Sequence, residues 1–293
     1  MKIKDQKVIE YEDELNDEFS EAVIVPRTID ENYKYKRGKL WNAFSWFVQT
    51  FLSLPLKFYG MNMFKVKYVG KEKYKKFKKT GYFIYGNHTQ PFGDTFIPSM
   101  ANYPKRNFFI VNPENISMKG SGWIIELLGA IPVPGNIKAT KNFMEIVEDR
   151  INKGHSVTIY PEAHIWPYYT KIRPFKSVSF KYPVKMKKPV FCFVNTYQRY
   201  GKKNDKVRIV SYIEGPFYPD EILPFKEAQE KLRNEVYNTM CELSKNSNIE
   251  VIKYMKKEEK DPFYSEENQK RLQKAIRDAE EGKLTNHEIK DDE

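Results

Sequence analysis

The sequence predicts an α/β fold, in which helices flank a mixed central sheet. From Tyr82 onward, short apolar runs alternate with stretches of helical periodicity, which is the layout of βαβ units. Hydrophobic residues make up 40% of the 293 residues, enough for a sizeable core. Ligands of such sheets collect beyond the carboxyl ends of the strands, so functional residues are expected directly after the apolar runs.

The strands and helices follow from the spacing of the apolar residues and from the turn residues between them. Strands are expected at Tyr82–Tyr85, Asn107–Val111, Ala130–Val133, Ser156–Tyr160, Val190–Asn195 and Val207–Tyr212. Helices are expected at Thr95–Ala101, Gly122–Leu128, Ala139–Lys153, Phe225–Ser244 and Glu266–Glu281. The last helix is heavily charged and the tail Asn286–Glu293 is polar, so neither needs a core.

Charge and hydropathy divide the chain into four predicted segments. Residues 1–33 form an acidic arm, expected to be partly ordered at best, and residues 34–80 form a basic amphipathic region expected to associate with membranes. Residues 81–250 hold the α/β domain, and residues 251–293 form a charged helical tail.

The run from Leu40 to Leu56 carries no charge and predicts an amphipathic helix that Pro55 closes. Its polar residues recur every three or four positions and form one stripe: Asn42, Ser45, Gln49 and Ser53. Apolar residues form the opposite stripe: Trp41, Phe44, Phe47, Val48 and Phe51. The run is slightly short for a bilayer span, which needs about 20 apolar residues. A helix lying in the membrane surface is expected; the alternative is a helix packed on the protein's own core.

The formal charge of +11 indicates an anionic partner. Residues 34–80 contain 13 Lys or Arg and one acid, Glu72, next to the apolar run. This arrangement favours an anionic lipid surface over nucleic acid, for which no motif occurs. A second basic run, Lys71–Lys79, either places its aromatic residues between lipid headgroups or is a solvated face. Cys192 and Cys241 give no disulfide framework, which suits the reducing cytoplasm.

A histidine and a carboxylate follow the first predicted strand. The segment from Gly86 to Asp94 reads Gly-Asn-His-Thr-Gln-Pro-Phe-Gly-Asp, which puts His88 and Asp94 a few residues apart. A histidine at a strand end can act as a general base near neutral pH. A nearby carboxylate can hold the imidazole in one tautomer and stabilise the imidazolium that forms. Such a pair suits attack by a hydroxyl on an acyl thioester.

The same segment resembles the Asn-His-x4-Asp block of the glycerolipid acyltransferases, the lysophosphatidate acyltransferase group. Tyr160-Pro161-Glu162-Ala163 is similar to the family's Phe-Pro-Glu-Gly block, again at a strand end. The order and spacing of the blocks agree over residues 82–197. The resemblance implies an acyltransferase-type fold over 81–250, with His88 as the base and Asp94 as its partner. It also implies that Asn87 and Glu162 serve substrate binding, Glu162 by contacting the acceptor or by ordering the loop.

Three departures from the family pattern bear on the acceptor. Five residues separate His88 from Asp94 where the family has four, and both arginines that grip the acceptor's phosphate are missing. His164 stands where the family's Phe-Pro-Glu-Gly block continues and is either a substitute phosphate ligand or an ordinary loop residue. The segment Arg173-Pro174-Phe175-Lys176 resembles the family's Phe-Lys-x-Gly segment, which makes Arg173 and Lys176 candidates for the missing cations.

The expected function is transfer of a fatty acyl group from acyl-carrier protein or acyl-CoA to a lysolipid hydroxyl. The first choice of acceptor is 1-acylglycerol 3-phosphate, at the cytoplasmic face of the membrane. One alternative is a lysolipid without a phosphate monoester, favoured by the missing arginines. Another is a catalytically silent lipid-binding protein of the same fold, favoured by the longer His–Asp spacing. No zinc pattern, Walker loop or dinucleotide fingerprint occurs, so neither a metal nor a cofactor is expected.

Overall fold

A computed structural model describes residues 7–19, 26–117, 122–201, 206–257 and 266–283. The chain divides into two compact units, Met1–Met255 and Lys256–Glu293. The polar tail expected at 286–293 lies outside the described residues.

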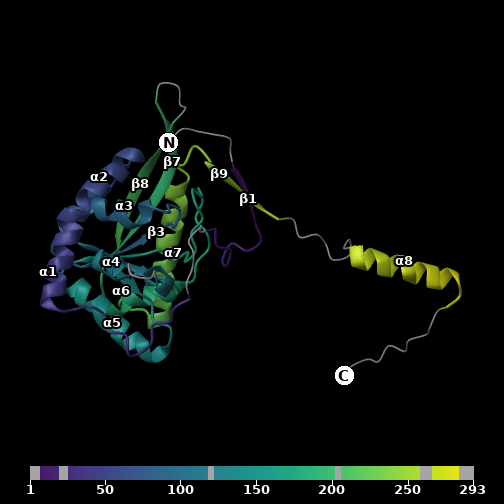
Figure 1. Cartoon of the computed structure of the whole chain (residues 1–293), viewed down its shortest axis with the longest axis horizontal. Coiled ribbons are helices and arrows are strands. Elements are labelled where there is room, and N and C mark those ends of the chain that lie inside the picture. The colour runs from purple at the N-terminus through teal and green to yellow at the C-terminus, as the bar shows by residue number, and fades with distance from the viewer. Residues whose placement is uncertain (1–6, 20–25, 118–121, 202–205, 258–265, 284–293) are drawn as a thin grey trace. The chain divides into compact units, whose positions relative to one another are not determined.

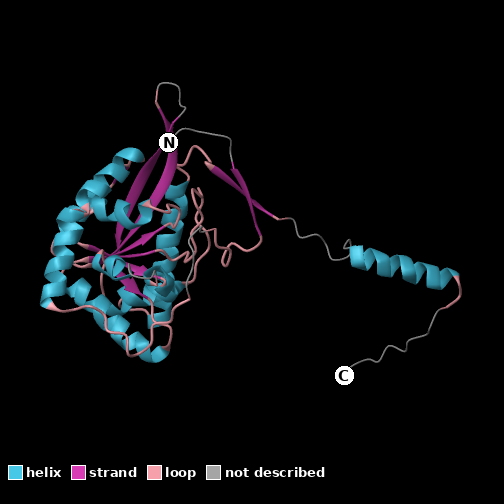
Figure 2. Cartoon of the chain, viewed as in Figure 1, coloured by secondary structure: helices cyan, strands magenta, loops and turns pink. Residues whose placement is uncertain are grey.

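A seven-stranded sheet with the strand order β2-β8-β7-β3-β6-β4-β5 forms the centre of the first unit (Figures 1 and 2). Its strands are β2 (Lys67–Val69), β3 (Tyr82–Gly86), β4 (Asn107–Val111), β5 (Ala130–Pro132), β6 (Ser156–Ile159), β7 (Val190–Tyr200) and β8 (Lys206–Phe217). All neighbours pair in parallel except β7 and β8, which are antiparallel. The predicted mixed α/β fold is therefore confirmed.

Helices cover both faces of this sheet. They are α1 (Lys39–Phe47), α2 (Leu54–Met63), α3 (Gly93–Ala101), α4 (Gly122–Leu127), α5 (Ile137–Asn152), α6 (Lys181–Met186) and α7 (Phe225–Ser244). Shorter turns of helix are η1 (Val48–Leu52, a π-helix), η2 (Lys71–Phe77), η3 (Pro113–Ile116) and η4 (Ser177–Phe180). Strands β1 (Lys7–Tyr11) and β9 (Ile252–Lys256) form a separate two-stranded sheet. Helix α8 (Glu266–Glu280) belongs to the second unit.

Side chains of β3 alternate between two hydrophobic cores, as the period of a strand requires. Phe83 and Tyr85 pack with α5 and α7, whereas Tyr82 and Ile84 pack with α3 and η2. Because both faces are covered, this central strand is buried along its whole length.

The predicted single helix at Leu40–Leu56 is wrong in its continuity. Pro55 does not close it but stands in the first turn of α2, where a proline's missing N–H costs no hydrogen bond. The two predicted stripes separate only in part: Phe44, Phe47 and Phe51 are exposed and Ser45 and Gln49 are buried, but Val48 is buried with the polar residues and Trp41 is half-buried. Ser45 and Gln49 face the protein, and both side chains donate to the carbonyl of Leu127, at 2.7 and 3.1 Å.

The predicted boundary at residue 81 cuts through the sheet, because β2 pairs with β8 and η2 packs beside them. The aromatic residues of the basic run Lys71–Lys79 pack against the protein's own core. Tyr74 is buried and stacks on Tyr82 at 5.3 Å between ring centroids, and Phe77 packs on the same ring. The burial of Tyr74 and the packing of half-buried Phe77 turn these rings towards the domain and leave the surrounding lysines at the surface.

Residues 7–19 of the acidic arm pack against the α/β domain. The arm crosses the loop at 163–173, where the Trp166 indole donates to the carbonyl of Asp17 at 2.8 Å. Tyr11 and Phe19 pack on the Trp166 ring, at 4.8 and 5.2 Å between centroids. Aromatic burial therefore holds this acidic segment against the domain.

Candidate active site

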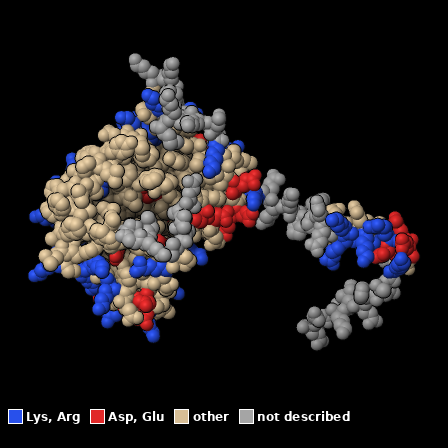
Figure 3. All heavy atoms as spheres, in the orientation of Figure 1, with Lys and Arg blue, Asp and Glu red and all other residues tan. Residues whose placement is uncertain are grey.

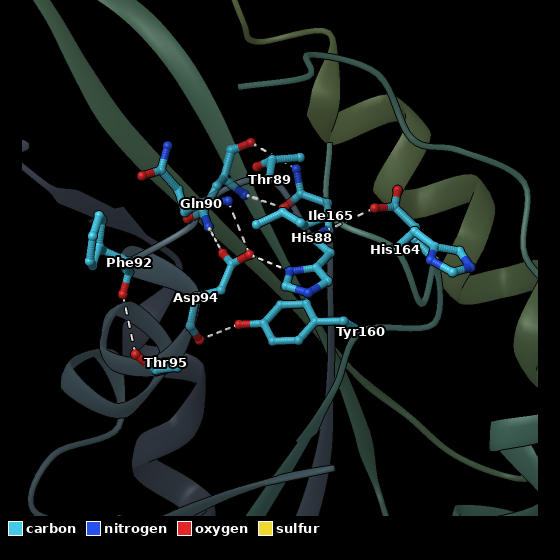
Figure 4. A network of polar contacts seen from close by, with 12 residues as sticks. His88, Thr89, Gln90, Phe92, Asp94, Thr95, Tyr160, His164 and Ile165 are labelled. Carbon is cyan, nitrogen blue, oxygen red and sulfur yellow. Dashed lines mark hydrogen bonds and ion pairs between the residues drawn. The ribbon is translucent and has the colours of Figure 1, made fainter. Parts of the chain in front are cut away.

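His88 and Asp94 lie in contact beyond the carboxyl end of β3. Asp94 belongs to the first turn of α3, and its Oδ2 is 2.7 Å from Nδ1 of His88 (Figure 4). The turn between them therefore brings the two side chains together despite its extra residue. Because the Asp94 carboxylate accepts a hydrogen bond from Nδ1–H, the other ring nitrogen of His88, Nε2, is the one that can receive a proton from a substrate.

Asp94 is buried, and donors surround its carboxylate. The backbone N–H of Gln90 donates to Oδ2 at 3.0 Å, and Nδ2 of Asn195 donates to Oδ1 at 3.3 Å. Burial raises the pKa of Asp94, while His88 and the backbone N–H groups act in the opposite direction. The carboxylate is thus fixed in position for the imidazole.

Glu162 joins the two loops that follow β3 and β6. Its Oε2 accepts from the N–H of His88 and its Oε1 from the N–H of Arg173, both at 2.9 Å. Burial raises the pKa of this carboxyl, and Arg173 and the two N–H groups oppose the rise. Of the two roles considered for Glu162, these contacts favour ordering the loop.

The structure contradicts Arg173 as a free ligand for an acceptor phosphate. Only 1% of its surface is exposed, and its guanidinium lies 3.8 Å from the Glu162 carboxylate. NH1 donates to the carbonyl of Glu14 at 3.1 Å, and NH2 donates to those of Glu162 and His164. The acidic arm supplies one of these acceptors, so the guanidinium is held inside the protein.

Arg173→Lys is expected to lower the free energy of unfolding by about 1–3 kcal/mol, because one ammonium cannot replace the guanidinium's several donors. Denaturant unfolding would measure this change. Lys171→Arg, at an exposed position nearby, should stay within about 0.5 kcal/mol of the native protein. If Arg173→Lys were fully stable and only weakened binding of a phosphate, the assignment of Arg173 to the fold would be wrong.

Asn87 is also engaged within the fold and not with a substrate. Its Oδ1 accepts from the N–H of Asn195 at 2.8 Å, and its Nδ2 donates to the carbonyl of Asn195 at 3.0 Å. The side-chain amide therefore makes the two hydrogen bonds that a neighbouring strand's backbone would make, and it connects the loop after β3 to β7. Its side chain is 1% exposed, which corrects its predicted place among the substrate-binding residues.

His164 and Lys176 line the same groove as His88. Nδ1 of His164 lies 2.9 Å from Oε2 of Glu18, so the acidic arm provides its partner. Lys176 is exposed. Of the predicted cations, Lys176 is thus the one that stays accessible from this groove.

The groove has a volume of about 1570 Å³ and continues from His88 towards η1 and α2. Its apolar lining includes Phe96, Phe109, Ile125 and Leu128. Among the described residues, no three His, Cys, Asp or Glu side chains gather as a metal site would require.

Two residues beside the pair were not predicted as site residues. Asn195 stands at the end of the predicted fifth strand, and Tyr160 occupies the aromatic position of the block that resembles Phe-Pro-Glu-Gly. Tyr160 stacks on the His88 ring, with 4.7 Å between centroids and 18° between planes. Tyr160 directly follows β6, and Asn195 lies in β7 opposite the loop after β3; these positions on the two neighbours of β3 are the signal that could have identified them.

The comparison with protein-family models agrees with the geometry. The acyltransferase family model matches residues 65–195, which include both loops of the site. A solved structure of the 1-acyl-sn-glycerophosphate acyltransferase PlsC from Thermotoga maritima is 18% identical, with a TM-score of 0.48, over 70% of this chain and 88% of that chain. No curated protein matches the sequence. Residues 65–195 are thus similar to the acyltransferase family, the family that the sequence resembles.

Proposed function

We propose that this protein transfers a fatty acyl group from a thioester, on acyl-carrier protein or CoA, to a lysolipid hydroxyl. The observation that carries the proposal is the His88–Asp94 contact at 2.7 Å, facing a groove with an apolar extension. The acyl chain would lie in that extension, where Phe96 and Phe109 exclude water. The tight contact argues against the silent lipid-binding alternative.

The reaction follows from the two nitrogens of His88. The acceptor hydroxyl oxygen attacks the thioester carbonyl carbon while Nε2 takes the hydroxyl proton. Asp94 stabilises the imidazolium through Nδ1. The tetrahedral intermediate expels the thiolate, which receives the proton from Nε2, so the products are an ester and a free thiol. An acyl-enzyme is not needed, and burial raises the pKa of the Cys192 thiol to about 12, far from a thiolate nucleophile.

The acceptor we favour is 1-acylglycerol 3-phosphate, held at the phosphate by exposed lysines of the groove, Lys176 and Lys7. The burial of Arg173 and the pairing of His164 with Glu18 favour the second candidate, a lysolipid without a phosphate monoester. The two candidates differ in whether the groove must bind a dianion. Assay of the purified protein with a thioester donor and a panel of lysolipids distinguishes them.

Lys176→Ala is expected to raise KM for lysophosphatidate about threefold to tenfold, since an exposed charge pair contributes little more than this. KM for the thioester donor should stay the same. Lys171→Ala removes an exposed lysine outside the groove lining and serves as the control. Equal KM values for native protein and Lys176→Ala would remove this lysine from the phosphate site and favour the second acceptor.

We also propose that the protein acts as a peripheral protein on the cytoplasmic face of an anionic membrane, docking through α1 and α2. No helix in the described part of the chain is both long and apolar enough to cross a bilayer. Ten large apolar residues between positions 40 and 63 are exposed: Leu40, Phe44, Trp46, Phe47, Phe51, Leu52, Leu56, Phe58, Tyr59 and Met63. We call this set the α1–α2 surface. Free cysteines suit the cytoplasmic side.

Charge beside the α1–α2 surface supports a lipid partner. Lys34, Lys36, Arg37 and Lys39 precede or begin α1. In Figure 3, the side where Figure 1 places α1 and α2 is largely tan, with Lys and Arg atoms gathered near the start of α1. A contiguous apolar surface with a basic edge fits acyl chains and anionic headgroups together.

A further inference from the structure

Helix α3 contains a proline at a position that matters for Asp94. In an α-helix, the N–H of residue 98 would donate to the carbonyl of residue 94. Residue 98 is Pro98, which has no N–H, so the Asp94 carbonyl loses its helical partner. The hydroxyl of Tyr160 donates to this carbonyl instead (Figure 4).

Tyr160 touches His88 as well, so one side chain contacts both members of the pair. Its ring lies nearly parallel to the imidazole at 4.7 Å. A Cβ on Gly86 would come within 2.9 Å of the Tyr160 ring, so glycine at the end of β3 leaves space for it. The ring is therefore confined between β3 and the imidazole.

We propose that Tyr160 is a positioning residue for the His88–Asp94 pair, its hydroxyl replacing the N–H that Pro98 lacks. The proposal rests on the proposed acyl transfer for its kinetic test. Asp94 stands in the first turn of α3, where helical backbone is least constrained. Without the Tyr160 hydroxyl, this turn is free to shift, and the carboxylate moves relative to Nδ1 of His88.

Tyr160→Phe keeps the stacked ring and removes only the hydroxyl. The expected result is a threefold to tenfold lower kcat, the size that loss of one neutral hydrogen bond gives, with KM for donor and acceptor unchanged. The matched control is Tyr85→Phe. Tyr85 is also buried, stacks on Phe180 at 4.0 Å and donates to the carbonyl of Ser179 at 2.9 Å, away from His88. An equal fall in kcat in both variants would overturn the proposal.

Pro98→Ala provides a rescue that tests the hydroxyl's partner. Alanine restores an N–H that can reach the Asp94 carbonyl, so the double variant Tyr160→Phe/Pro98→Ala should recover most of the lost kcat. If the hydroxyl acted on a substrate instead, restoring the helical N–H would recover nothing. A double variant no faster than Tyr160→Phe therefore contradicts the positioning role.

An NMR measurement tests the proposal without turnover. The Nδ1 proton of His88, hydrogen-bonded to Asp94, should give a downfield resonance in the native protein and in Tyr85→Phe. Tyr160→Phe should shift it upfield or broaden it through exchange with water. An unchanged resonance in Tyr160→Phe overturns the positioning role. If the native protein is inactive on every lysolipid, the proposed function fails, and this resonance still decides the role of Tyr160.

Discussion

Replacement of His88 by alanine is expected to lower kcat for acyl transfer by about 10² to 10⁴, the usual contribution of a positioned general base. Without the imidazole, the acceptor hydroxyl must lose its proton to water as it attacks the thioester. Steady-state release of free thiol from an acyl thioester, with a lysolipid present, measures the effect. The fold should persist, because His88 is partly exposed at the groove and carries no core contact comparable to Tyr85.

Asp94→Asn is expected to cut kcat heavily and leave residual activity, because it disturbs the imidazole without removing the base.

His155→Gln is the matched control for His88→Ala: this histidine lies beside Phe108, and burial and nearby cations lower its pKa to about 4. It does not line the groove, and its replacement should leave kcat unchanged. Near-native turnover by His88→Ala would show that this histidine is not the base.

The elements with strong local signals were predictable from the sequence. The predicted bounds of β4 and α7 agree with the structure at both ends. For β4 the signal is a short run of apolar residues between turns, and for α7 it is a long amphipathic stretch after Pro224. Strand β7 runs past its predicted end at Asn195 through the polar residues Gln198 and Arg199, and β8 runs past Tyr212 through Gly215 and Pro216, residue types that usually mark the end of a strand.

The pairing of His88 with Asp94 was predictable because a few residues and one strand end fix their neighbourhood. The burial of Arg173 was not predictable from the sequence. Its burial depends on the carbonyl of Glu14, 159 positions away, and on Trp166, whose ring lies 4.9 Å from the guanidinium. A spacing pattern identifies a cation near a motif but does not tell which carbonyls a distant arm brings to it.

Membrane docking has to be tested by surface substitutions, because the N-terminal helices are also part of the fold. Arg106 is buried, and its NH2 donates to Oγ of Ser45 at 2.7 Å. Deleting α1 would leave this guanidinium without that acceptor, at a cost in stability. Loss of vesicle binding by such a deletion would therefore report unfolding as readily as a lost membrane contact.

The triple variant Phe44→Ser/Phe47→Ser/Phe51→Ser changes only exposed parts of the α1–α2 surface, where each ring is about half exposed. If each ring enters the acyl region on docking, its loss costs about 1–1.5 kcal/mol, so vesicle binding should weaken about 10²- to 10³-fold. Sedimentation with anionic vesicles measures this. The binding that remains should fall further with salt, since the basic residues before α1 are unchanged.

The matched control replaces exposed apolar residues elsewhere, Ile222→Ser/Phe225→Ser, before and at the start of α7. This variant should sediment like the native protein, because general surface hydrophobicity is not what the proposal requires. Equal weakening of both variants would assign binding to non-specific adsorption. If the triple variant bound as tightly as the native protein, the proposal of membrane docking would be wrong. Ser45 and Gln49 would still hold this helical segment on the domain through the carbonyl of Leu127, and its exposed aromatic residues would face a partner other than a membrane.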